Sequence, residues 1–311
     1  MLFPLVVAAT LTVAAIDIGG GEAPPPIPPR FARGAITVAV AATTTDLRDL
    51  VVAVGGDRVS VESLTDPRQD PHAREIHPRQ LALLSRADLL VRVGLDHEPW
   101  LPRALRAAGV TPRDLDASRV VTLLDTQTPR LRADSRPHVH AFGNTHYWLD
   151  PENARPLTAL IAEKLGEMVP ADRAVFAANR DRFLSELDAR LARWRGELRP
   201  HAGTRVVVAH DTWPYFAHRF GLTIVATIEE KPGVPPSPRY LGALMEQMKQ
   251  IGIGTILAEP SAPAAVLARV AAGTGARVVT LVPSVGADAE ATDYLTRFDV
   301  NVRRLVKALA R

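Results

Sequence analysis

The chain has 311 residues, of which 47% are hydrophobic and 23% are charged, and its formal net charge at pH 7 is +3. This composition is globular, long enough for one large domain or two of ordinary size, and unlike that of a disordered chain. Arginine and acidic residues are interspersed without a basic stripe, so we expect no nucleic-acid partner. Cysteine is absent, which excludes disulfide bonds, cysteine-ligated zinc and thiol catalysis.

Residues 1–33 predict an export leader followed by a spacer. Residues 2–16 are apolar and uncharged, too short a run for a typical transmembrane helix but suited to a signal-peptide core. The basic residue usual before such a core is missing, which fits either a misassigned start codon or a segment that is kept as an anchor. Residues 19–34 are rich in glycine and proline, which predicts a stiff, unfolded spacer. We therefore expect a periplasmic or other extracytoplasmic location.

Strands and helices alternate in residues 34–168, which predicts a first α/β lobe. Short runs rich in β-branched residues indicate buried strands, and amphipathic runs indicate helices. The predicted strands are residues 35–42, 59–64 and 88–94. The predicted helices are residues 45–54, 78–87 and 98–109, the first of them stopped by Gly55 and Gly56.

Residues 169–200 predict one long linking helix. Neither glycine nor proline occurs from Ala171 to Arg195, and the apolar positions follow a helical period. At about 1.5 Å per residue this helix is roughly 40 Å long, a length suited to a rigid connection between two domains. A long helix within one domain is the alternative.

The alternation resumes in residues 201–311, which predicts a second α/β lobe with no sequence repeat of the first. The predicted strands are residues 204–210, 222–228, 254–259 and 276–282. The predicted helices are residues 213–221, 238–252, 263–275 and 292–311. The fold class is therefore α/β, with two parallel sheets.

Several polar residues fall where ligands collect in open α/β sheets, beyond the carboxyl ends of the strands. His210 and Glu259 end predicted strands, and His72 follows another in the segment TDPRQDPH. His146 precedes a helix that we expect to be capped by Asp150. Three imidazoles from both lobes and one oxygen would form a four-coordinate zinc site in the cleft between them. A hydrogen-bonded structural role is the alternative for each histidine.

Six segments carry a family resemblance: GDRVSVESLTDPRQDPHAREIHP, ADLLVRVGLDHEPWL, GNTHYWLDPENA, AHDTWPYFAHRFGL, EEKPGVPPSPRYL and AEPSAPAAVLARVAAGTGARVVTL. In this order they resemble the metal-binding solute-binding proteins of zinc and manganese ABC importers. The likeness extends from about residue 36 to residue 310. It implies two α/β lobes joined by a long backbone helix, with the metal ion held between them.

Carried over one position at a time, the resemblance assigns metal ligands to His72, His146 and His210. The third position is His in zinc binders and often Glu in manganese binders, so His210 favours zinc. Three neutral imidazoles also suit zinc better than manganese, which prefers carboxylate oxygens. His138 and His140 fall where many zinc-binding members have a histidine-rich loop, and we interpret them as loop residues. The remaining histidines are interpreted as solvated or hydrogen-bonded: His77, His97, His201 and His218.

The fourth ligand departs from the family pattern. The family commonly has an Asp after the last strand, where this chain has Val282, Pro283 and Ser284. We favour Glu259 over Asp288, Ser284 or a water molecule. Glu259 could instead orient a histidine by accepting its N–H.

We therefore predict a monomeric, exported protein that captures zinc and delivers it unchanged to the permease of an ABC transporter. A zinc hydrolase is one alternative, because three histidines and a water molecule also form a catalytic site. The sequence contains neither an HExxH motif nor a carboxylate spaced as a general base, and both absences argue against a hydrolase. We therefore expect no enzymatic activity. An adhesin or interaction protein of the same fold is the other alternative.

Overall fold

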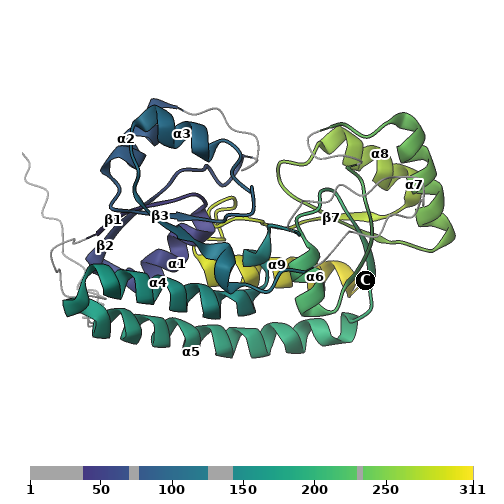
Figure 1. Cartoon of the computed structure of the whole chain (residues 1–311). Helices are drawn as coiled ribbons and strands as arrows, with labels where there is room; N and C mark the ends of the chain where they lie inside the picture. Colours follow the sequence, from purple (N-terminus) through teal and green to yellow (C-terminus); the bar gives the residue numbers. More distant parts are fainter. Residues whose placement is uncertain (1–37, 70–76, 125–142, 230–233, 311) are drawn as a thin grey trace, which may run out of the picture. The chain divides into compact units, whose positions relative to one another are not determined.

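The computed structural model describes residues 38–69, 77–124, 143–229 and 234–310 (Figure 1). These residues belong to one compact unit, residues 33–311. The predicted leader and three of the histidines, His72, His138 and His140, lie outside the described residues.

The first sheet has four parallel strands in the order β2-β1-β3-β4. β1 and β3 consist of Ala, Val and Leu apart from Arg92 at the end of β3, and their apolar residues are largely buried because helices cover both faces of the sheet. β4 was not predicted, because its sequence RDLD buries only Leu115 and an edge strand needs few apolar residues. The strands are β1 (Val38–Ala42), β2 (Val59–Ser63), β3 (Leu89–Arg92) and β4 (Arg113–Asp116).

Helices cover this sheet on both faces (Figure 1). α2 and α3 pack against each other over one face, in an apolar cluster that includes Leu90. α1 packs against α4 and α5 on the other face. α1 ends as predicted at its two glycines, since Gly56 has φ 58° and the left-handed region suits glycine. The helices are α1 (Thr45–Gly55), α2 (Pro78–Arg86), α3 (Leu101–Ala108) and α4 (Ala154–Met168).

The long helix is confirmed as α5 (Arg173–Leu198), which has 26 residues and follows a 3₁₀ turn at Pro170–Asp172. It packs against α1, α4 and α9, so it is also part of the core. Its buried apolar residues are Phe176, Phe183, Leu187, Leu191, Trp194 and Leu198. No helix in the described part of the chain has both the length and the apolar character needed to cross a membrane.

The second sheet has the parallel order β6-β5-β7-β8, the same order as the first sheet when strands are counted along the chain. In β5, Val206 and Val208 join one apolar cluster and Val207 joins another, because successive side chains point to opposite faces. The strands are β5 (Arg205–Val208), β6 (Thr223–Thr227), β7 (Thr255–Ala258) and β8 (Arg277–Thr280). The helices are α6 (Pro214–Phe220), α7 (Pro238–Gln250) and α8 (Ala264–Thr274).

The closing helix is confirmed as α9 (Tyr294–Leu309), and it contacts elements of both lobes. Its N-cap is Asp293, whose carboxylate accepts from the backbone N–H groups of Leu295 and Thr296. It packs on β8 and α5 and reaches α1, where the backbone N–H of Tyr294 donates to Asp49 at 2.6 Å. α9 therefore ties the end of the chain to the first helix.

Candidate metal site

A cavity of ≈ 310 Å³ lies at the carboxyl ends of the strands of the second sheet and is lined by residues of both lobes. His146 and Trp148 line it from the first lobe. His210 follows β5, Glu229 follows β6 and Glu259 follows β7, and all three side chains line it from the second lobe. This is the place where open α/β sheets bind ligands.

The structure brings two of the predicted ligands together. The ring centroids of His146 and His210 are 5.9 Å apart, with an angle of 81° between the ring planes. His146 is buried, and the side chain of His210 is partly exposed. Two imidazoles from segments far apart in the sequence therefore face one cavity.

The segment Asn144–His146 sets the orientation of the His146 ring. Oδ1 of Asn144 accepts from the backbone N–H of His146 at 2.9 Å and lies 3.1 Å from its Nδ1. Because this oxygen can only accept, Nδ1 carries the proton and the lone pair of the neutral ring is on Nε2. Nδ2 of Asn144 donates to the carbonyl oxygen of Asp211 at 2.8 Å, which links the two histidine-bearing segments.

His97 and Trp148 pack behind the His146 ring. His97 is fully buried, and its Nδ1 lies 2.9 Å from Oγ1 of Thr145. Its ring meets those of His146 and Trp148 edge-on, at centroid distances of 5.6 and 5.1 Å. His97 is thus hydrogen-bonded, as expected, and it also supports His146. Asp150 caps the next turn through its contact with the Glu152 N–H, as predicted.

Glu229 holds the His210 ring through a contact between its Oε2 and Nδ1. A carboxylate only accepts, so Nδ1 donates and Nε2 provides the lone pair in the neutral ring, the usual arrangement of metal-binding histidines. Burial lowers the pKa of His210, but the hydrogen bond and charge of Glu229, with Glu259, raise it to about 9. A metal ion must therefore displace a proton from this ring at neutral pH.

Glu229 was not predicted as a residue of the site. The signal was present, because Glu229 follows the predicted strand at residues 222–228 just as Glu259 follows the next one. The same strand-end rule would have selected both acids.

Glu259 is 7% exposed and directly follows β7. Burial raises the pKa of its carboxyl group, against the lowering effects of the His210 charge and of contacts with Thr212 and Trp213. Within the described part of the chain, its Oε1 has no hydrogen-bond partner. A buried carboxylate oxygen without a partner is costly, and a bound cation would remove that cost.

Of the other two candidate residues for the fourth ligand, only one lies at the cavity. Ser284 lines the cavity. Asp288 is not among the lining residues, and its Oδ2 accepts from Arg304 on α9 at 2.6 Å. Among the residues that the structure describes, no three His, Cys, Asp or Glu side chains are arranged to hold a metal ion. His72, the third predicted imidazole, is outside those residues.

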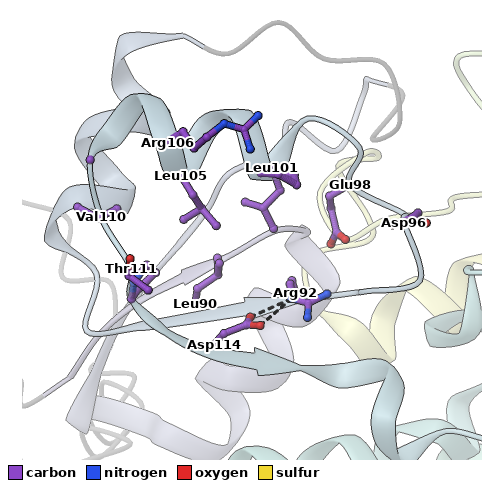
Figure 2. A pocket seen from close by; sticks show the side chains of 13 residues that line it. Leu90, Arg92, Asp96, Glu98, Leu101, Leu105, Arg106, Val110, Thr111 and Asp114 are labelled. Atoms are coloured by element: carbon purple, nitrogen blue, oxygen red, sulfur yellow. Dashed lines mark hydrogen bonds and ion pairs between the residues drawn. The ribbon is translucent and has the colours of Figure 1, made fainter.

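A larger cavity of ≈ 570 Å³ lies between α3 and the β3–β4 part of the first sheet (Figure 2). Figure 2 shows Leu90, Leu101 and Leu105 along its wall and Arg92 at its base. The Arg92 charge is already offset, since its guanidinium lies 2.9 Å from both Asp114 and Asp116. None of the described residues that line this cavity is a histidine, so it is not the candidate metal site.

Comparison with known proteins connects this geometry to a family. Residues 40–308 match the family model described as zinc-uptake complex component A, periplasmic. The chain is 28% identical over 235 residues to the high-affinity zinc uptake system protein ZnuA of Paracoccus denitrificans, a match covering 65% of this chain and 70% of that protein.

Solved structures show the same relationship. A crystal structure of ZnuA matches with a TM-score of 0.75 and 27% identity, over 88% of this chain and 99% of that chain. A zinc-bound ZnuA deletion mutant matches with a TM-score of 0.73 and 28% identity, over 88% of this chain and 98% of that chain. Fold and cavity thus define a metal-binding solute-binding protein. The chain belongs to the ZnuA family of zinc-uptake proteins.

Proposed function

We propose that this protein captures a zinc ion outside the cytoplasm, in the cavity between its lobes, and delivers it to the permease of an ABC importer. The observation that carries the proposal is the pair His146 and His210, whose ring centroids are 5.9 Å apart. Each ring has Nδ1 held by an oxygen acceptor, so each presents Nε2 as the metal donor.

We propose His72, His146 and His210 as three ligands and a Glu259 oxygen as the fourth. Three imidazoles and one carboxylate oxygen make a tetrahedral set of the kind zinc prefers. His72 lies in the connection between β2 and α2, which follows a strand end, as His210 and Glu259 also do. The buried, unpartnered Oε1 of Glu259 supports its place in the set.

The charges of the cavity support a divalent cation. Glu229 and Glu259 both line it, and one Zn²⁺ ion offsets two carboxylate charges. The predominance of nitrogen donors favours zinc over manganese. The cationic side chain of Arg68 also lines the cavity, but it is exposed to solvent.

The proposal includes no enzymatic activity. A catalytic zinc site keeps one coordination position open for water, whereas the proposed ligand set fills that position with a Glu259 oxygen. The ion is therefore bound as cargo and leaves unchanged. Because His146 and His210 belong to different lobes, a partner that moved the lobes apart would break the ligand set and release the ion. The proposed partner is a membrane permease, and the proposed acting form is a monomer.

Calorimetric titration of the chelator-stripped protein tests the proposal. We expect one tightly bound zinc ion per chain, and none after simultaneous replacement of His72, His146 and His210 by Ala. The matched control replaces His201 and His218, which do not line the cavity, and should leave uptake unchanged. Undiminished uptake in the triple variant would contradict the site.

A further inference from the structure

A buried ion pair lies next to the cavity. Arg297 on the first turn of α9 and Asp46 on the first turn of α1 are both fully buried, with Nε and Oδ1 3.2 Å apart. Taking two charges out of water is costly, and their attraction often only balances that cost. A gain in folding stability is therefore a weak explanation for this ion pair. The other contacts of Arg297 and Asp46 indicate a further role.

The guanidinium of Arg297 donates to two carbonyl oxygens of the cavity wall. Nη2 donates to the oxygen of Trp148 at 3.2 Å, and Nη1 donates to the oxygen of Pro283 at 3.4 Å. Trp148 and Pro283 both line the cavity, although they are far apart in the sequence. The Trp148 indole also donates to the Pro283 oxygen at 3.1 Å. These three hydrogen bonds connect Arg297, Trp148 and Pro283 to one another and so join the two segments of the cavity wall that contain Trp148 and Pro283.

The surroundings of Arg297 restrict its movement. Its guanidinium carbon lies 4.3 Å from the ring centroid of Phe298 and 5.0 Å from that of Tyr294. Tyr294 adds a second donor to the Trp148 oxygen, through its hydroxyl at 2.8 Å. On the other side of the pair, Asp46 contacts Val285 and Ser284, and Ser284 lines the cavity next to Pro283.

The wall is connected directly to a proposed ligand. Trp148 is two residues beyond His146 in the 3₁₀ turn Tyr147–Leu149, and the Leu149 N–H donates to the His146 oxygen at 3.1 Å. The indole of Trp148 also packs against the His146 ring, at a centroid distance of 5.3 Å. A shift of the Trp148 carbonyl would therefore shift the imidazole.

We propose that Arg297, with its charge offset by Asp46, is a positioning residue for the zinc site. It fixes the turn that carries His146 relative to the Pro283–Ser284 wall, and it thereby sets the zinc affinity. The inference rests on the proposed zinc site. A planar guanidinium can bond to two carbonyls and a carboxylate at once, whereas the point charge of a lysine cannot.

Two variants test the inference. Arg297→Lys keeps the charge but loses the double carbonyl contact, and Asp46→Asn with Arg297→Met removes both charges so that neither is left unpaired. We expect zinc affinity, measured by competition with a chromophoric chelator, to fall about 10–100-fold in both, as for other groups that orient metal ligands. The visible absorption spectrum of the Co²⁺-loaded protein should also change, since it reports ligand geometry rather than stability.

Asp299→Asn is the matched control. Asp299 is on the same helix, but it accepts from Arg190 at 2.5 Å and from the Trp194 indole at 2.7 Å, both on α5. We expect a lower Tm with unchanged zinc affinity and Co²⁺ spectrum.

Wild-type affinity and spectrum in both folded test variants would overturn the inference, and so would failure of both variants to fold, because the pair would then serve the fold alone. Absence of zinc binding by the wild type would instead overturn the proposed function.

Discussion

His146 and His210 share a local design in which an oxygen acceptor holds Nδ1 and the lone pair is left on Nε2. Asn144 supplies that oxygen to one ring and Glu229 to the other. That both histidines face one cavity could be predicted from the sequence, because one ends a strand and the other precedes a capped turn. Which oxygen each histidine contacts could not be predicted. A side-chain contact such as that of Glu229 with His210 joins two different strands and produces no periodic pattern in the sequence.

Glu259→Gln tests the fourth ligand, because it keeps the side-chain shape and removes the charge. We expect zinc affinity to fall more than tenfold, a change of about 1.4 kcal/mol or more. A residue that only orients a histidine can cause a similar loss, so X-ray absorption must distinguish the two roles. The spectrum of the wild type should fit three imidazoles and one oxygen, and that oxygen should be lost in the variant.

Asp288→Ala is the control for that substitution, since Asp288 pairs with Arg304 and does not line the cavity. We expect no change in zinc affinity. A large loss at Asp288 with none at Glu259 would show that the wrong strand end was chosen.

The raised pKa of His210 predicts a particular pH dependence. Its value in the folded protein, about 9, exceeds the ordinary value of 6.5, so the metal-free folded state holds this proton more tightly than the unfolded chain does. The stabilisation from the Glu229 pairing is therefore fully present below pH 6.5 and lost as the pH rises through about 9. Zinc competes with the same proton, so zinc affinity should keep rising from neutral pH to about pH 9.

Calorimetry in buffers of different ionisation enthalpy counts the protons released on zinc binding. We expect release at pH 7.5 in the wild type and less in Glu229→Gln, where the His210 pKa loses its main raising influence. A wild-type zinc affinity that is flat from pH 7 to pH 9 would contradict this account of His210.

At the scale of elements, the sequence patterns identified the helices and strands whose burial is periodic. α5 was recognisable because nothing in Ala171–Arg195 interrupts a helix, and α1 because two glycines end it. β4 was missed because three of its four residues are polar. The packing of α9 on α1 was also missed, since it depends on Asp46 and Asp49 meeting the start of a helix about 245 residues away.

At the scale of the molecule, the two lobes repeat one strand order without repeating a sequence. That order places the carboxyl ends of the central strands at predictable edges, which is why a cleft with histidines from both lobes could be predicted. The largest apolar cluster runs from β1 through α5 to β5 and α9, so the lobes share part of one core. The boundaries at residues 34–168, 169–200 and 201–311 remain predictions, as does export through the leader.

A crystal structure of the zinc-loaded protein with anomalous data at the zinc edge tests the central claim most directly. We predict one anomalous peak in the cavity, about 2.0–2.1 Å from Nε2 of His72, His146 and His210 and about 2.0–2.2 Å from a Glu259 oxygen. A peak outside the cavity, or one in the cavity without His146 and His210 as ligands, would contradict the account.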